Sequence, residues 1–445
     1  DLTNKMGFWL DLQNPYITFD NKYIESVWWI IKQIYDKDYM YKGYTIQPYS
    51  PAAGTGLSSH ELNQPGTYKE VTDTTVAAQF ITSEEAVNKA FGIITPMGLP
   101  TYFIAWTTTP WTLPSNTALA VGKEIEYALV QTFNPYTFQL CQVVLAKALI
   151  SKWFKPENEN ASFEDYKPGD KNIPYIILQI CKGNQLAGIE YEQLLPYEAN
   201  AKKHIEGDAW KVIVGDFVST EDGTGIVHIA PSFGADDNRV AKQNNIGSLT
   251  MVDKAGKFIE GMGELSGRYV KDYINEADYK SPDIDIAIKL KTENKAFNVQ
   301  KYAHNYPHCW RTDKPILYYP LDSWFIAMNK AKDKLVANNK KINWKPESTG
   351  TGRFGNWLEN IQDWNLSRSR YWGIPLPIWR TEDNSEQKCI GSVEELKVEI
   401  EKCNASGLRP IQKSALPDLH KPFIDEVVLL SESGKLMRRE LDVID

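Results

Sequence analysis

The sequence predicts an α/β plus mainly-β fold in which a β-barrel-like domain lies between segments with helical patterning. Three observations lead to this prediction. The chain has 445 residues, well beyond the ~100–200 residues of a typical domain, so more than one core is expected. Short β-rich runs follow one another between Thr101 and Val227. Amphipathic helical patterns and helix-capping signals lie on either side of them.

The first helical pattern lies near the amino terminus. Its apolar residues recur at helical spacing and are Val27, Ile30, Ile31, Ile34 and Tyr35. They predict a long amphipathic helix over residues 23–41, which Gly43 ends. Residues 44–66 are rich in Pro, Gly and Ser, so an irregular connection is expected there. Thr82 and Glu85 then form a capping-box pattern that opens a short helix.

The β-rich part consists of short runs separated by turn residues. These runs are residues 102–106, 127–130, 142–145, 175–178 and 212–214. Because no helical pattern separates them, a barrel or sandwich is favoured. Later helices are predicted over residues 237–245, over residues 323–336 with Ser323 as the cap, and after Ser392, where Glu395 completes a capping box.

The composition excludes several classes of protein. A hydrophobic share of 42% with 24% charged residues is ordinary for a folded globular chain. The net charge of −8 argues against a surface that is basic throughout, although it allows a local basic track for nucleic acid. The five cysteines lack paired spacing, so the sequence does not predict a disulfide framework. A cytoplasmic location is therefore expected. No apolar run approaches the ~18–20 residues of a membrane span.

The first candidate site is the segment 106–116, which holds Thr107, Thr108 and Thr109. These threonines end an apolar strand, and Pro110 follows where strand pairing must stop. Their hydroxyls could hold a water molecule or bind a ligand carbonyl. A β-branched strand end whose threonines face the solvent would give the same pattern, so both interpretations stay open at this point.

The second candidate site is the segment 223–237. A strand that carries His228 runs into a Pro/Gly turn, and Asp236 and Asp237 stand at the start of the next helix. Acidic residues in that position also satisfy free helical amides and the helix dipole, without any ligand. A single histidine is more often structural than catalytic. The pattern therefore names candidates without giving them a role.

Metal binding finds little support in the sequence. Only His304, His308 and Cys309 cluster, whereas a zinc site needs four ligands at short paired spacings. The sequence also contains no P-loop, no Gly-x-Ser-x-Gly elbow and no His-Glu-x-x-His motif.

Both candidate segments closely resemble the two signature segments in the editing domain of isoleucyl-tRNA synthetases, which are class I synthetases. The valyl and leucyl enzymes have Arg where this chain has Pro110, so the resemblance is to the isoleucyl group. Residues 14–18, 306–311 and 367–377 are similar to flanking segments of the same family, in the same order. The resemblance therefore covers nearly the whole chain.

The resemblance implies an editing domain inserted between pieces of a Rossmann-type class I synthetase catalytic domain. The implied limits are residues 1–50 for a catalytic-domain fragment with a connecting helix, 51–305 for the editing domain, 306–345 for the return connection and 346–445 for a second catalytic-domain fragment. The His-Ile-Gly-His and Lys-Met-Ser-Lys-Ser motifs, which serve ATP in the family, are absent. Both ends of the chain interrupt patterned segments, so an internal fragment is expected. ATP and Mg would serve the parent enzyme, and the fragment is expected to need no cofactor.

Some members of the family bind zinc in this insertion through two pairs of cysteines. The matching positions here are Ser50, Ala53, Cys309 and Thr312, so three of the four ligands are missing. No metal is therefore expected.

The resemblance also implies a reaction, the hydrolysis of valine from mischarged tRNA(Ile), with the tRNA(Ile) acceptor end as the partner and a monomeric fragment as the catalyst. The implied catalytic residues are Thr107, Thr108 and Thr109, which would orient the ester and the attacking water, and Asp237, which would hold the α-ammonium group. Four further residues are implied to bind the substrate. His228, together with Thr109, would line the side-chain pocket, and Asn116 would help orient the substrate. Trp111 and Tyr306 would contact the tRNA end. A non-catalytic module that docks the acceptor end and a degenerate structural insertion are the alternatives.

Overall fold

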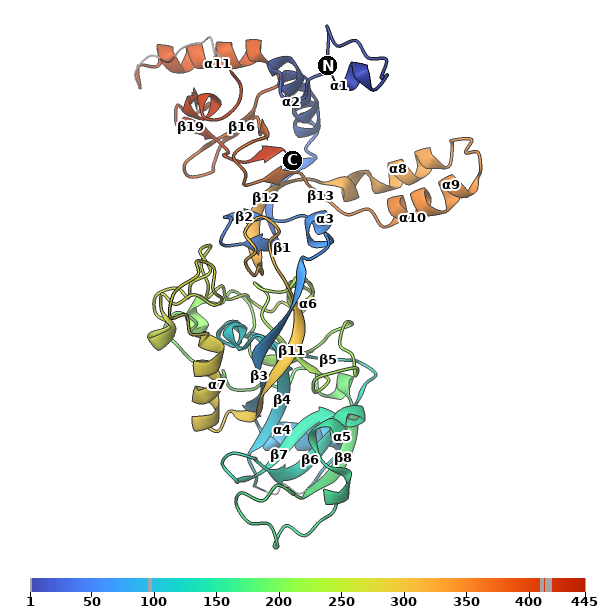
Figure 1. Cartoon of the computed structure of the whole chain (residues 1–445), viewed down its shortest axis with the longest axis vertical. Helices are drawn as coiled ribbons and strands as arrows, with labels where there is room; N and C mark the ends of the chain where they lie inside the picture. The colour runs from blue at the N-terminus through green and yellow to red at the C-terminus, as the bar shows by residue number, and fades with distance from the viewer. Residues whose placement is uncertain (1, 95–97, 409–411, 413–417, 445) are drawn as a thin grey trace. The chain divides into compact units, whose positions relative to one another are not determined.

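The computed structural model describes residues 2–94, 98–408, 412 and 418–444 (Figure 1). They form two compact units, of which one is Thr45–Leu321 and the other combines Asp1–Tyr44 with Asp322–Asp445. The first unit extends past both limits of the predicted editing range, residues 51–305, whose functional boundaries stay a prediction. Among the described helices, none has both the length and the apolar character needed to cross a membrane.

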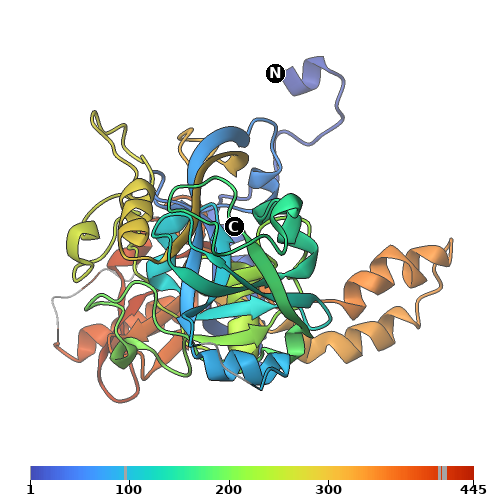
Figure 2. The same ribbon diagram turned by 90° about the horizontal axis from the view of Figure 1, so that it is seen from below.

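A six-stranded mixed sheet is the largest element of the unit Thr45–Leu321. In spatial order its strands are β11 (Ala296–Pro307), β3 (Tyr68–Thr82), β4 (Thr101–Thr107), β7 (Leu140–Ala146), β6 (Glu126–Phe133) and β8 (Tyr175–Lys182). Strands β4 and β7 pair in parallel, and the other neighbours are antiparallel. The long strands β3 and β11 lie side by side over nearly their whole length (Figure 2). The five β-rich runs of the sequence are all strands, so the mainly-β prediction is confirmed.

A second sheet packs against the first and shares its core. Its order is β10 (Ile226–Ile229), β5 (Ala118–Val121) and β9 (Lys211–Val214). Alternate residues of a strand point to opposite faces, and here they enter two different cores. Leu119 and Val121 meet Phe80 and Phe103 of the large sheet. Ala118 and Ala120 face helix α6 (Ala235–Gln243) instead. The small sheet therefore lies between the main core and α6.

Three local predictions need correction. Ser83, not Thr82, caps helix α4 (Glu84–Phe91), because its side chain accepts from the Ala86 amide. Part of the segment 44–66 is strand β1 (Met40–Ser50), which pairs with β2 (Thr55–Gly56). Its Tyr and Ile content outweighs the breakers.

Ser323 does not cap a helix, which is the third correction. It lies inside strand β12 (Leu317–Ile326), and the next α-helix is α8 (Lys332–Asn339). Leu317, Tyr319 and Leu321 are buried at every second position, which is strand periodicity.

The unit of Asp1–Tyr44 and Asp322–Asp445 has its own core. Helix α2 (Asn21–Asp36) contributes Ile24 and Trp28, which pack with Trp379 and with Ile400 of α11 (Val393–Ala405). Helix α2 from the first part of the chain and α11 from the last part therefore share one core.

Two antiparallel sheets complete this unit. Their orders are β17-β16-β19-β18 and β14-β20-β15, with the strands at β14 (Ser367–Arg368), β15 (Ile374–Pro375), β16 (Ile378–Thr381), β17 (Gln387–Cys389), β18 (Val428–Leu430), β19 (Leu436–Arg439) and β20 (Val443–Ile444). Within the described residues, these strands pair with one another in antiparallel fashion. The Rossmann-type arrangement accordingly stays a prediction.

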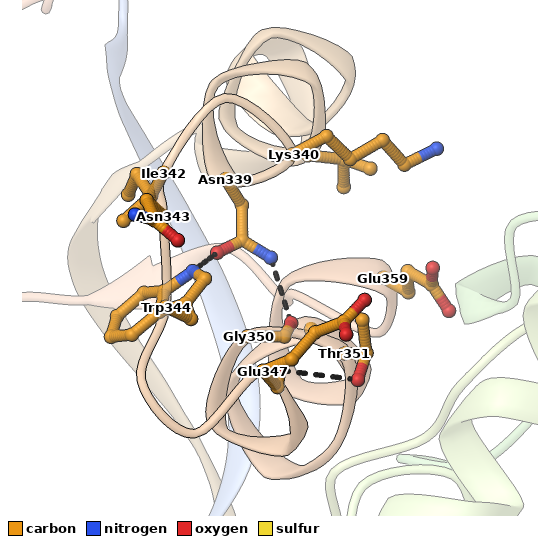
Figure 3. Close-up of a pocket in the computed structure, with 11 residues that line it drawn as sticks. Asn339, Lys340, Ile342, Asn343, Trp344, Glu347, Gly350, Thr351 and Glu359 are labelled. Atoms are coloured by element: carbon orange, nitrogen blue, oxygen red, sulfur yellow. Dashed lines mark hydrogen bonds between the residues drawn. The ribbon is translucent and has the colours of Figure 1, made fainter.

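A helical hairpin of this unit encloses a cavity of about 430 Å³. Figure 2 shows its helices α8 and α10 (Arg353–Glu359) side by side. The Asn339 amide braces the turn between them, because it donates to the Gly350 carbonyl at 2.9 Å and accepts from the Trp344 indole at 2.8 Å (Figure 3). A side chain at Gly350 would strike the Trp344 ring, so glycine is required there. The predicted site residues belong to the other unit.

Candidate functional site

The threonine segment is a compact turn at the end of β4. The strand ends at Thr107, and the 3₁₀ helix η1 (Pro110–Ser115) follows. Thr107 Oγ1 accepts from the Thr109 amide at 3.1 Å and lies 3.3 Å from Thr109 Oγ1. Thr112 Oγ1 donates to the Thr109 carbonyl at 2.8 Å. Within the part of the chain that the structure describes, the half-buried Thr108 hydroxyl makes no hydrogen bond, so it is available to a ligand.

His228 of β10 joins this turn. Strand β10 pairs antiparallel with β5, and the His228 Nε2 atom lies 2.9 Å from Thr112 Oγ1. The other ring nitrogen, Nδ1, lies 3.5 Å from the Asn116 amide nitrogen. Burial lowers the pKa of His228 to about 4, so the imidazole is neutral near pH 7. The two segments singled out in the sequence therefore meet in space.

Asp237 stands in the first turn of α6, just after β10. Its Oδ2 atom accepts from the amide of Ala230 at 2.9 Å, and Gly234 is the N-cap residue of the helix. The carboxylate thus holds the turn between β10 and α6, and it also accepts from its own backbone amide in the first turn of the helix, so the structural alternative at the helix start stays open. Burial, followed by the neighbouring charge of Asp236, raises the pKa of Asp237 to about 6.

The two adjacent acids differ in their charge partners. Asp236 is exposed and pairs with Arg239 at 3.1 Å. Over the described residues, no Lys, Arg or His forms an ion pair with Asp237. A half-buried carboxylate without a cation is costly to the fold and is suited to a positively charged ligand.

Asn116 and Trp111 are engaged by the protein itself. The Asn116 amide donates to the Ala118 carbonyl at 2.8 Å and accepts from the Tyr191 hydroxyl at 2.7 Å. Trp111 is 3% exposed, and its ring meets Phe233 edge-on with centroids 5.1 Å apart. Both side chains lie next to the threonine turn and help to shape it, and their predicted contacts with substrate stay predictions.

Tyr306 lies on β11. Its hydroxyl donates to the Ile316 carbonyl at 2.9 Å, and the ammonium group of Lys271 lies 5.1 Å from its ring centroid. Burial raises the pKa of Tyr306 to about 12. Among the described residues, Tyr306 makes no hydrogen bond or ring contact with Thr107, Thr109 or His228, and its predicted role at the tRNA end stays a prediction.

Sequence reasoning missed an anchor of the turn. Asp283 of helix α7 (Pro282–Thr292) accepts from the Trp111 amide at 2.8 Å. Lys271 lies beside it, 3.6 Å from Asp283 Oδ2 and 2.9 Å from Asp73 Oδ2. Ser281 and Asp283 resemble an ordinary helix start, and no local pattern signals a partner 172 residues away. Thr112 was also missed, although it lies one helical turn after Thr109.

The residues at the family's zinc positions do not fit a zinc ion. Cys309 is the one thiol among the four, and it packs with Leu57, Leu62 and Ile316. Burial would raise the pKa of this thiol, but hydrogen bonds that reach it from Thr312 and Ser50 hold the pKa below its usual value. No group of three or more His, Cys, Asp or Glu side chains in the described ranges is arranged to hold a metal ion.

A fold with this inserted β unit and this site defines a class of protein. The family model for tRNA synthetases class I (I, L, M and V) matches residues 1–445, and the chain belongs to that family. Within the family, the chain is similar to isoleucine–tRNA ligases over its whole length. It is 59% identical to the one from Cytophaga hutchinsonii, 53% identical to one from Bacteroides fragilis and 42% identical to the one from Clostridium tetani. The chain spans 41%, 42% and 37% of those relatives.

Solved structures give a more distant likeness. GlLeuRS-CP1 matches with 14% identity and a TM-score of 0.36, over 52% of this chain and 100% of that one. The editing domain of P. knowlesi cytosolic leucyl-tRNA synthetase matches with 12% identity and a TM-score of 0.34, over 56% of this chain and 100% of that one.

Proposed function

We propose that this chain carries a hydrolytic editing site that removes valine from mischarged tRNA(Ile). The observation that carries the proposal is the half-buried carboxylate of Asp237, which pairs with no cation among the described residues and follows the strand whose His228 meets the threonine turn. The parent enzyme would ligate isoleucine to tRNA with ATP and Mg, in the cytoplasm, through segments that carry the two ATP motifs absent here. The fragment itself would act as a monomer without a cofactor.

The need for such a site follows from the size of the substrates. Valine and isoleucine differ by one methylene, which an apolar pocket can distinguish by only ~1–3 kcal/mol, and isoleucyl-tRNA synthetase is itself the standard example of this limit. A second, smaller site that hydrolyses the wrong product adds the missing selectivity.

The chemistry requires positioning more than a strong nucleophile, because an aminoacyl ester is already activated. Asp237 would pair with the α-ammonium group, which supplies the cation that the carboxylate lacks. The hydroxyls of Thr107, Thr108 and Thr109 would orient the ester and the attacking water. The neutral imidazole of His228, with Thr109, would bound the side-chain pocket and exclude the extra methylene of isoleucine.

The main alternative is a module that docks the tRNA acceptor end without cleaving the ester. It would use the same hydroxyls and aromatic side chains for binding alone. The unpaired charge of Asp237 favours the hydrolase, because tRNA is a polyanion and a buried carboxylate contributes nothing to holding it.

Hydrolysis of valyl- and isoleucyl-tRNA(Ile) by the 445-residue chain tests the proposal. We expect valyl-tRNA to be deacylated at least tenfold faster than both isoleucyl-tRNA and the enzyme-free control. Binding of both tRNAs with no release of amino acid above that control would establish the docking alternative.

A further inference from the structure

We infer that Asp283 is a positioning residue for the editing site, because its carboxylate fixes the threonine turn through the amide of Trp111. This inference rests on the proposed function, since it names what holds that site in place. Asp283 contacts the backbone amide of Trp111, but within the described part of the chain it makes no hydrogen bond to Thr107, Thr108, Thr109, His228 or Asp237. It acts through η1, the element that carries Thr112 and follows Thr109 directly.

The carboxylate meets η1 where the helix has a free donor. The first amides of a helix have no partner within the helix. Pro110 occupies the first position and has no N–H, so Trp111 offers the first amide. Asp283 Oδ1 accepts from it at 2.8 Å. A negative charge at this end also suits the dipole of the turn.

Lys271 holds the carboxylate in place. The Lys271 residue is 8% exposed, and its ammonium group lies between two acids, 3.6 Å from Asp283 Oδ2 and 2.9 Å from Asp73 Oδ2. Asp73 also meets His304 Nε2 at 3.2 Å. These contacts thus link η1 and α7 to strands β3 and β11. They form a single buried ionic network of Asp283, Lys271, Asp73 and His304.

The network is not required for packing alone. Helix α7 already buries Ile286, Ala287 and Leu290 in the main core. An apolar side chain at position 283 would be cheaper to bury than a carboxylate and a lysine. What the carboxylate adds is a fixed location for the Trp111 amide. Since His228 Nε2 lies 2.9 Å from Thr112 Oγ1, a shift of η1 also disturbs the neighbouring hydroxyls.

The test compares substitutions of Asp283 in the 445-residue chain. Asp283→Ala removes the acceptor, and we expect kcat for valyl-tRNA hydrolysis to fall ten- to a hundredfold with KM changed less than threefold. The Trp111 amide should exchange with deuterium at least tenfold faster, while the Leu129 amide in the large sheet keeps its protection. Asp283→Asn keeps an acceptor oxygen, so it should restore most of the rate and the Trp111 protection.

Asp285→Ala is the matched control. It removes an acid from the same helix, but this side chain is half exposed and pairs with Arg268 on the surface. Its rate and its Trp111 exchange should equal those of the unsubstituted chain. If Asp283→Ala does not fold, Asp283→Leu removes the same acceptor while preserving the volume, and the same two results are expected.

Three outcomes would overturn the inference. The first is a folded Asp283→Ala or Asp283→Leu chain with an undiminished rate and a protected Trp111 amide. The second is Asp283→Asn as slow as Asp283→Ala. The third is equal loss of protection at Trp111 and Leu129, which would mean a general loss of stability. If the unsubstituted chain releases no valine, the proposed function fails, and Trp111 exchange still decides whether Asp283 anchors the turn.

Discussion

The substitution Asp237→Asn separates ammonium recognition from a structural role. It removes the charge of the carboxylate and keeps an oxygen that can accept from the Ala230 amide, the contact that Asp237 makes at 2.9 Å. If the carboxylate pairs with the α-ammonium group, the variant loses a hydrogen bond to a charged partner, worth ~1.5–3 kcal/mol. Valyl-tRNA hydrolysis should then slow about ten- to a hundredfold. Asp237→Ala should be equally slow.

The same substitution should not destabilise the fold. The pKa of Asp237 is raised from 3.8 to about 6, and one pKa unit corresponds to ~1.4 kcal/mol. Because the folded pKa lies above the unfolded one, the buried charge destabilises the folded chain above pH 6 by up to ~3 kcal/mol, and this penalty disappears below about pH 4. Asn has no such charge. The free energy of unfolding in urea near neutral pH should therefore stay equal or rise.

The pH dependence provides a third measurement. Only the ionised carboxylate pairs with an ammonium group, so kcat/KM for valyl-tRNA should fall about tenfold per pH unit below pH 6. The Asn variant should show no such fall between about pH 5 and 7. An Asn variant that deacylates at the unsubstituted rate would refute ammonium recognition. So would a variant that loses ~0.5–2 kcal/mol of stability while each folded molecule stays active.

Three further predictions concern the pocket, the metal and the missing ATP motifs. His228→Ala should enlarge the side-chain pocket, so the preference for valyl- over isoleucyl-tRNA should fall at least tenfold in parallel deacylation assays. Elemental analysis of the purified chain should find less than about 0.1 zinc per molecule. A stoichiometric zinc ion that is lost in the Cys309→Ser variant would contradict the conclusion that the residues around Cys309 do not fit zinc. ATP–pyrophosphate exchange with isoleucine should stay at the blank level, and exchange above it would reveal an ATP site that the sequence does not show.

Local patterns predicted the strands better than the connections between elements. The runs 102–106 and 127–130 are rich in β-branched and aromatic residues, and both are central strands. Ser323 was misassigned because serine before an apolar run resembles a helix cap. The alternation of Leu317, Tyr319 and Leu321 just before it indicated a strand. Periodicity over several residues was more informative than one capping residue.

The site was predictable only in part, and for a physical reason. The resemblance to a known editing domain singled out four residues, which are Thr107, Thr109, His228 and Asp237. From the residue types alone, a solvent-facing strand end would explain the threonines equally well, and a helix cap would explain the acid equally well. The bond between the Trp111 amide and Asp283 joins residues 172 positions apart. Such a contact depends on how α7 packs beside η1, and no composition or spacing within either segment encodes it.

The buried Asp283 and the half-buried Asp237 show how the charged neighbours of an acid distinguish a structural support from a candidate binding group. Asp283 lies beside the cation of Lys271 and accepts from the Trp111 amide, so it has partners within the protein. Burial alone would lower the pKa of Lys271, but the carboxylates of Asp283 and Asp73 raise it above its usual value. Asp237 accepts from the backbone amides of Ala230 and of Asp237 itself and lies beside the acid Asp236, so no cation of the described residues compensates its charge. The fold places a cation beside one carboxylate and none beside the other, and this difference supports the proposal that Asp237 pairs with the α-ammonium group of the substrate.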